Sequence, residues 1–388
     1  MSKTKIKRKK KKLNVVHIVP ASPHQCGMYE TARELVFAER KLGINAHIFD
    51  PRSTKQQTKG KKQVVNAKKI SCPKCKHDFK IQDTQDIPTA PSAWTGDRGV
   101  CVCDLEFALK SDVIVSHSGA PEDMFKDCQV PRIHVAHGRP NSSFRIEQSG
   151  QTPIYTMYKK FNEDPRWKYM ITLWEGYEQY WKLVFPEVKT FLPFVDLKEW
   201  SFEESDYDFG GNKGSINVVV TDIWRMDKTP FHVLNAFVLF AEQNPGAKIH
   251  FYGLDPNGRG RDTLLDCLKE RGILGETAGM VLNLKEVYRA ADMLITPHTI
   301  ATRTVREALA CGLNVVAGLG NPYTEYNAYD EDLIAFSDMM NVSWNDWKNN
   351  KQANRDANRL MAENSFDVQT TAKKFIELFN ELAGREAA

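Results

Sequence analysis

The chain has no apolar run that approaches the ~20 residues a helix needs to cross a membrane. Residues 13–20 follow a basic run, but they are too short for the hydrophobic region of a secretory signal and have the pattern of a first buried strand. We therefore expect a cytoplasmic protein. At 388 residues, the chain is long enough for two domains, each with its own core.

The sequence also lacks G-x-G-x-x-G, the glycine pattern that binds the pyrophosphate of a dinucleotide. This absence disfavours a dehydrogenase. The strand, turn, helix and strand expected over residues 13–49 are nevertheless typical of a nucleotide-binding half-unit.

Cysteine is scarce, and eight cysteines in a cytoplasmic chain argue against a disulfide framework. Four of them form two close pairs: Cys72 with Cys75 and Cys101 with Cys103. The first pair has the spacing of a zinc knuckle, in which two thiolates approach one ion from a tight turn. The four cysteines predict a structural Zn²⁺, with His77 as an alternative ligand. Residues 52–104 hold too few apolar residues for a core, so we expect a small metal-stapled insertion and no catalytic metal.

Acidic residues are missing from two basic stretches, residues 1–12 with eight Lys or Arg and residues 51–77 with nine. Without these 17, the rest of the chain holds 36 basic against 49 acidic residues. One interpretation of the basic stretches is solvated, lysine-rich sequence. The other is a surface for a polyanion, with nucleic acid as the first candidate and an anionic membrane surface as the second.

The remaining chain is organised around residues 291–320, which have the pattern strand, loop, helix, strand. A short apolar run, residues 293–295, ends at Pro297, and a loop rich in threonine follows. Apolar residues then recur at helical spacing until Gly312. A loop that leads from the carboxyl end of a parallel strand into a helix N-terminus is where α/β proteins bind anions.

Two further loops that follow predicted strands contain histidine. His117 follows the strand of residues 112–115, and His137 follows the strand of residues 132–135. Carboxyl ends of parallel strands share one edge of the sheet, so both histidines are candidates for a site. A histidine at a strand end is also often structural, and that alternative stays open.

The sequence EALACG, which begins at Glu307, resembles the donor-binding segment of retaining glycosyltransferases of family 4. In that family an acidic residue, seven further residues and Glu-Ala open a helix that ends in Cys-Gly. The resemblance implies that Glu307 holds the nucleotide ribose. The first acid, which contacts the transferred sugar, is replaced here by Thr299, so sugar recognition stays open. Arg303 and Thr304 in the same segment are further donor-binding candidates.

Other parts of the chain match the family in order. The resemblance implies that Gly27 lies in a turn under the donor phosphates, that His137 approaches the transferred sugar, and that Arg225 and Lys228 clamp the diphosphate. Gly253, at the end of a predicted strand, is a further donor-side candidate. His117 and Arg139 are expected on the acceptor side.

The resemblance implies an α/β chain of two Rossmann-like domains, the GT-B fold. The expected parts are a basic tail (1–12), an N-terminal acceptor domain (13–200) with the insertion (52–104), a linker (201–215), a nucleotide-sugar domain (216–365) and a C-terminal segment (366–388). An amphipathic helix over residues 368–382 is expected to cross back to the first domain.

Local alternatives exist for the donor-binding candidates. Thr304 and Glu307 have the spacing of a capping box, and Arg303 and Glu307 are an ordinary i, i+4 pair. Arg225 and Lys228 also fit a solvated, charged turn.

Together the matches predict a metal-independent, retaining hexosyl- or pentosyltransferase that uses a nucleotide-diphosphate sugar. The basic stretches favour a polyanionic acceptor, with a modified base in DNA first and a membrane-associated glycan second. A lipid or polysaccharide acceptor stays open. A sugar-nucleotide epimerase of the same fold is disfavoured by the missing acid at Thr299. A non-catalytic nucleic-acid-binding protein on a decayed GT-B fold is the other alternative.

Overall fold

The computed structural model describes residues 12–20, 27–51, 69–71, 78–80, 103–117, 122–137, 160–221, 231–254, 261–279, 281 and 283–385. The chain divides into two compact units. The first comprises Met1–Leu192 together with Val368–Ala388, and the second comprises Pro193–Asp367.

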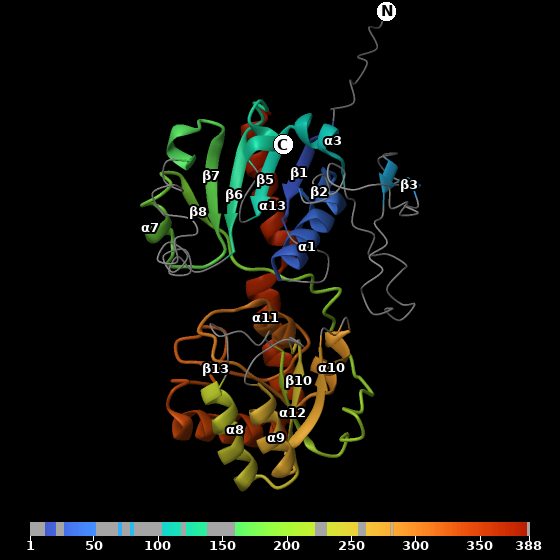
Figure 1. Ribbon diagram of the computed structural model, residues 1–388, viewed down its shortest axis with the longest axis vertical. Helices are drawn as coiled ribbons and strands as arrows, with labels where there is room; N and C mark the ends of the chain where they lie inside the picture. Colours follow the sequence, from blue (N-terminus) through green and yellow to red (C-terminus); the bar gives the residue numbers. More distant parts are fainter. Residues whose placement is uncertain are drawn as a thin grey trace, which may run out of the picture. The chain divides into compact units, whose positions relative to one another are not determined.

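The first unit is built on a parallel sheet with six strands among the residues described (Figure 1). Its order is β2-β1-β5-β6-β7-β8. The strands are β1 (Asn14–Ile18), β2 (Asn45–Phe49), β5 (Val113–His117), β6 (Arg132–Ala136), β7 (Trp167–Thr172) and β8 (Val188–Thr190). Every residue of the central strands β5 and β6 is buried, as in parallel strands covered by helices on both faces, although Ser116, His117, Arg132 and His134 are polar or charged.

Helices α1 (Gly27–Lys41) and α13 (Val368–Leu382) pack against each other, and in Figure 1 the red α13 lies alongside the blue α1. Both helices contact the ring of His17 on β1, α1 through Glu39 and α13 through Phe379. They therefore cover the same face of this strand. The remaining described helices of the unit are α3 (Leu105–Leu109), α4 (Glu122–Phe125) and α7 (Glu178–Trp181).

The second unit has its own parallel sheet, again with six strands in the part of the chain that is described, in the order β11-β10-β9-β12-β13-β14. These strands are β9 (Ile216–Val220), β10 (Ala247–Tyr252), β11 (Leu274–Ala278), β12 (Met293–Ile295), β13 (Val315–Gly318) and β14 (Asn327–Ala328). The helices are α8 (Phe231–Gln243), α9 (Arg261–Glu270), α10 (Leu284–Ala290), α11 (Arg303–Ala310) and α12 (Leu333–Phe366), which is kinked at Asn350.

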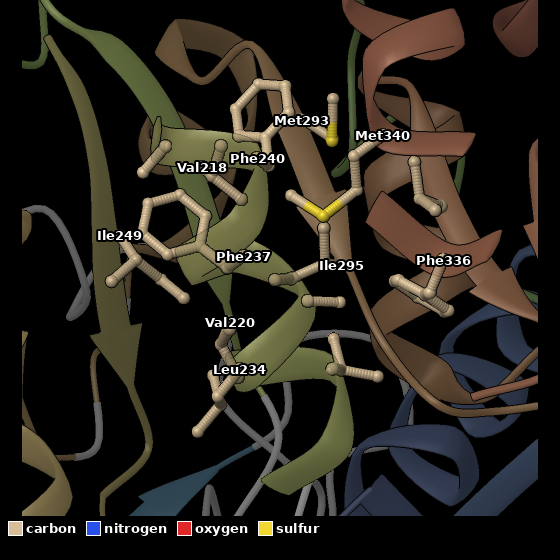
Figure 2. Packing of buried hydrophobic residues seen from close by; sticks show 14 of the residues in the cluster. Val218, Val220, Leu234, Phe237, Phe240, Ile249, Met293, Ile295, Phe336 and Met340 are labelled. Atoms are coloured by element: carbon tan, nitrogen blue, oxygen red, sulfur yellow. The ribbon is translucent and has the colours of Figure 1, made fainter. Parts of the chain in front are cut away.

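A core of interlocking apolar side chains joins this sheet to its helices. Figure 2 shows Val218, Ile249 and Ile295 from three strands packing against Phe237 of α8 and Met340 of α12. All five are fully buried. This core fixes the positions of the strand ends from which the neighbouring loops start.

The predicted fold class, two Rossmann-like α/β units, is confirmed by the two sheets. Residues 201–215, expected as a linker, are tied to the second unit: Ser201 O accepts a 2.9 Å hydrogen bond from Arg289 Nε, and Tyr207 OH donates a 2.7 Å bond to Glu276. The predicted insertion contributes the antiparallel pair β3 (Lys69–Ser71) and β4 (Asp78–Lys80). None of the helices described is both long and apolar enough to cross a membrane.

Candidate active site

The strand order places one topological switch point in each sheet. In the first sheet, β1 lies between β2 and β5; in the second, β9 lies between β10 and β12. Connections from these central strands leave in opposite directions, which opens a crevice at the carboxyl ends where α/β proteins bind ligands. The loops that follow β5, β6 and β12 therefore lie where a site is expected.

The loop after β12 is held by a close backbone approach at Gly318. The Gly318 amide donates a 3.2 Å hydrogen bond to His298 O. A Cβ at Gly318 would lie 2.2 Å from the carbonyl oxygen of Pro297, closer than real contacts allow. Glycine is therefore required at Gly318 by space, because any side chain would displace the loop.

Asn321 holds the same loop from a second side. Its Nδ2 donates to the carbonyl oxygens of His298 and Ile300, at 3.2 Å and 3.3 Å. Two carbonyls of the loop are thereby satisfied by one side chain. The loop enters α11 in a fixed conformation, with Thr302 as the N-cap.

Glu307 lies in the second turn of α11, with 5% of its side chain exposed. Arg303 Nε lies 2.5 Å from Glu307 Oε1, so the predicted i, i+4 pair is present and almost buried. The capping-box alternative is wrong, because the helix begins at Arg303 and its N-cap is Thr302, two residues before Thr304. Thr304 instead shares a 3.0 Å hydroxyl contact with Thr302.

In the first unit, four side chains form a continuous chain of hydrogen bonds. Glu39 Oε2 lies 2.9 Å from His17 Nε2, His17 Nδ1 lies 3.0 Å from His117 Nε2, and His117 Nδ1 lies 2.7 Å from His137 Nε2. Glu39, His17 and His117 are fully buried, whereas His137 is partly exposed. We refer to these four residues as the histidine chain. It crosses from α1 over β1 and β5 to the residue after β6.

Several contacts and charges act on the histidine chain. Trp174 Nε1 donates a 3.3 Å bond to His137 O and so fixes the backbone that carries this ring. Burial raises the pKa of the Glu39 carboxyl, an effect that His17 opposes. Burial also lowers the pKa of His117 well below its ordinary value, and the neighbouring His137, His17 and His134 lower it further. Burial lowers the pKa of His134 to about 3.

The structure brings His117 and His137 together, as their strand-end positions predicted, and groups Thr299, Arg303, Thr304 and Glu307 on one loop and helix. Gly27 is the first residue of α1 rather than part of the preceding turn. Gly253 follows β10 with φ 97°, and its amide donates a 2.7 Å bond to Gly279 O. Three of the residues predicted for the donor and acceptor sides lie outside the described residues: Arg139, Arg225 and Lys228.

Of the predicted zinc ligands, Cys72, Cys75 and Cys101 lie outside the described residues. Cys103 is described, and it packs in the apolar core of the first unit with 5% exposure. Among the residues that the structure describes, no group of three or more His, Cys, Asp or Glu side chains could hold a metal ion. The zinc site stays a prediction.

His17, Glu39 and Asn321 were missed from the sequence. A signal existed for His17, because a histidine interrupts the apolar run of the first strand. Glu39 carries a weaker signal, since it lies four residues after Leu35 on the buried side of α1. No local sequence pattern indicates the role of Asn321.

No protein-family model and no curated protein match the chain. Solved structures do. Anabaena HepE in complex with UDP-glucose superposes with a TM-score of 0.66 at 12% identity, over 95% of this chain and 100% of that one. Sucrose-phosphate synthase from Thermosynechococcus elongatus gives 0.66 at 14% identity, over 96% and 100%. The pneumococcal O-GlcNAc transferase GtfA in complex with UDP and GlcNAc gives 0.62 at 12% identity, over 96% and 99%.

The fold is GT-B. Identities of this size establish the fold alone, so the chemistry has to follow from the residues of this GT-B chain itself. Those residues offer a fixed loop and buried carboxylate in the second unit, and a histidine at the end of a buried hydrogen-bonded chain in the first.

Proposed function

We propose that this GT-B chain is a glycosyltransferase that moves a sugar from a nucleotide-diphosphate donor to an acceptor. The observation that carries the proposal is Glu307, a nearly buried carboxylate in the helix that starts beside the second switch point. Its two oxygens can accept hydrogen bonds from two adjacent ribose hydroxyls, and Arg303 holds one of them in place. The solved relatives in complex with UDP or UDP-glucose favour this class of donor.

The donor diphosphate is assigned to the second unit. Negative charge develops on the nucleotide as the bond to the sugar breaks, and cations placed at that position stabilise the transition state. We assign this role to Arg225 and Lys228, helped by the N-terminus of α11 near Thr302–Thr304. Thr299 is assigned to the donor side on its position in the loop, and Gly253 lies at a strand end of the same sheet edge.

The acceptor is assigned to the first unit, with His117 and Arg139 on the acceptor side. His137, which is hydrogen-bonded to His117, is assigned to the transferred sugar, and Gly27, at the start of α1, is assigned to the donor side. Resemblance to family 4 favours retention at the anomeric carbon. We place the acceptor domain at residues 13–200 and the donor domain at residues 216–365, with the C-terminal helix returning to the first.

Titration calorimetry with nucleoside diphosphates and their sugars tests the donor site. We expect Glu307→Gln to weaken binding of one of them by about 10- to 100-fold, because a hydrogen bond to a charged group is worth about 1.5–3 kcal/mol. Arg225→Ala should weaken the same ligand. Glu363→Gln is the matched control, since Arg359 and Glu363 form the same i, i+4 pair at 2.7 Å on α12. Absence of binding by any nucleotide, or equal losses in Glu307→Gln and Glu363→Gln, would contradict the proposal.

For the acceptor, we propose a modified base in DNA. The support is the two basic stretches, residues 1–12 and 51–77, on an otherwise acidic chain, with a zinc ion on Cys72, Cys75, Cys101 and Cys103 stapling the second. DNA binding should weaken steeply with salt, and the slope should fall when the lysines of both stretches are changed to glutamine. Transfer to DNA and DNA binding that both survive these changes would exclude the basic stretches as the DNA-binding surface. Transfer to a lipid or polysaccharide and not to DNA would replace this acceptor assignment.

A further inference from the structure

Arg303 and Glu307 form a nearly buried ion pair on one face of α11. Arg303 Nε lies 2.5 Å from Glu307 Oε1, and only 12% of the Arg303 side chain and 5% of the Glu307 side chain are exposed. Lys110 and Glu106, an ion pair of the same spacing on α3, are 72% and 76% exposed, and such exposed pairs contribute little to stability. Water screens the pair on α11 poorly, so separating its charges is costly unless a new charged partner replaces one of them.

This ion pair engages the carboxylate that the proposed donor site needs. An ionised carboxylate accepts hydrogen bonds at both oxygens, from hydroxyl groups or from cations. In the structure, the Nε–H of Arg303 uses part of this capacity at Oε1, and the positive charge of Arg303 offsets the negative charge of Glu307. The contact that holds the carboxylate in place therefore also competes with a ribose hydroxyl group for it.

The start of α11 carries positive charge without an acidic residue to offset it. Arg303 is the first residue of the helix, and its first turn contains no Asp or Glu. The side chain of the N-cap residue, Thr302, makes no capping hydrogen bond to the helix. A helix N-terminus carries about half a positive charge, which repels a cation and attracts an anion. Glu307, one turn further on, is the anion that Arg303 contacts in the structure, and a diphosphate at this end of the helix would offer a second one.

The spacing of the two side chains matches the order of the polar groups in a nucleotide. Four residues of an α-helix rise by about 6 Å along its axis. Arg303 lies nearer the helix N-terminus, to which the diphosphate is assigned, and Glu307 lies one turn away, where the ribose is assigned. Because the diphosphate and the ribose are joined through one carbon atom, a single ligand can reach both side chains.

We propose that the diphosphate of the donor draws Arg303 away from Glu307 and so releases the carboxylate for the ribose hydroxyl groups. This inference rests on the proposed donor site in the second unit. Arg303 is then a specificity-determining residue, because only a ligand with both a diphosphate and a ribose gives each of the two side chains a new partner. A nucleoside alone separates Arg303 from its carboxylate and brings no charge to replace it. Inorganic pyrophosphate alone does the same to Glu307.

The exchange of partners makes the two parts of the donor bind cooperatively. Whichever part binds first breaks the ion pair between Arg303 and Glu307, and the other part then binds to a side chain that is already released. Coupling between two binding events is reciprocal, so each part raises the affinity for the other by the same factor. Couplings of this kind are typically about 5- to 150-fold.

Titration calorimetry of the full wild-type chain with the separate parts of the donor tests this coupling. The probes are uridine, cytidine, adenosine and guanosine, each with and without saturating inorganic pyrophosphate. We expect pyrophosphate to lower the dissociation constant of one nucleoside about 10-fold. The 2′,3′-dideoxy form of that nucleoside should show no such effect, because it has no hydroxyl group for Glu307. No effect of pyrophosphate on any nucleoside, or an equal effect on the dideoxy form, would overturn the exchange.

Arg303→Met should change the affinities for nucleoside and nucleoside diphosphate in opposite directions. The nucleoside should bind about 10-fold more tightly, because nothing competes for Glu307, and its diphosphate about 10-fold more weakly, because the phosphates lose a charged partner. The effect of pyrophosphate on the nucleoside should disappear. Arg271→Met, the matched control, should change none of these, since Arg271 pairs with Glu242 at 3.3 Å where both side chains are exposed. Weaker binding of both ligands by Arg303→Met, as a structural role predicts, would overturn the exchange. The wild-type titrations decide the point even if this variant does not fold.

Failure of the exchange and failure of the proposed function give different results. Tight binding of a nucleoside diphosphate whose two parts bind independently would retain the donor site and reject the exchange. Cooperative binding in a chain that transfers no sugar would retain the exchange and reject the glycosyltransferase. Absence of binding by every nucleotide would reject both.

Discussion

Replacing Gly318 with alanine would displace the loop that leads into α11. The new Cβ would lie 2.2 Å from Pro297 O and 2.9 Å from its carbonyl carbon, and both atoms belong to the backbone. Ordinary contact begins near 3.4 Å, so the loop would have to move by about 1 Å. Overpacking of this kind costs about 1–3 kcal/mol. For a unit of this size, we expect Tm to fall by about 2 to 12 °C.

The same displacement should reach the donor site. A shift of about 1 Å in a positioning group can lower a rate by about 100-fold. Calorimetric melting and nucleotide titration of Gly318→Ala would measure both effects. The matched control is Gly214→Ala, because a Cβ at Gly214 meets nothing within 4 Å. If Gly318→Ala melts and binds nucleotide as the wild type does, then the close approach does not hold the loop.

Three further outcomes follow from the packing of buried polar groups. Arg132→Ala should lower the free energy of unfolding, measured by urea denaturation, by about 3 kcal/mol or more, because the buried guanidinium donates to the carbonyls of Phe125 and Cys128. The control Lys110→Ala, which removes one partner of an exposed ion pair, should change this free energy by less than about 1 kcal/mol. Equal effects of the two variants would refute the reasoning. Gly275→Ala should destabilise the second unit, because the new Cβ would lie 2.3 Å from the ring of His250. A variant that melts at the same temperature as the wild type would contradict this expectation. Burial lowers the pKa of His250 to about 4, so the unfolded chain binds the proton more readily than the folded chain. The free energy of unfolding should therefore fall as the pH drops from about 6.5 towards 4, by up to about 1.4 kcal/mol per pH unit. Urea denaturation across this pH range measures the fall, and in His250→Gln the free energy of unfolding should depend on pH less steeply, by the equivalent of one bound proton.

The regular elements could be predicted where a local pattern encodes them. Residues 293–295 and 368–382 were predicted with the bounds that β12 and α13 have, because the first is an apolar run ended by proline and the second has a clear apolar face. β11 (Leu274–Ala278) was missed, since its residues are only partly buried and include Gly275 and Glu276. Its strand conformation depends on pairing with β10.

Part of the candidate site could be predicted from the sequence and part could not. The contact between His117 and His137 could be predicted, because both residues follow strands of one parallel sheet and the carboxyl ends of such strands lie at the same edge. Glu39 could not be assigned to the same cluster, since its contact with His17 depends on how α1 packs across β1. The role of Asn321 depends likewise on a loop that precedes it by some twenty residues. Contacts that cross elements carry no local signal.

The place of α13 in the first unit has a consequence for biosynthesis. The first unit takes its last helix from the final residues of the chain, after the whole second unit has been translated. At ordinary translation rates of about 5–20 residues per second, roughly 10 to 40 s separate the synthesis of residue 192 from that of residue 388. During this interval, the side of α1 that α13 will cover lacks its partner, and Phe379 has not yet closed over His17. A nascent chain therefore exposes the apolar surroundings of the histidine chain to chaperones until α13 has been synthesised and has packed against α1.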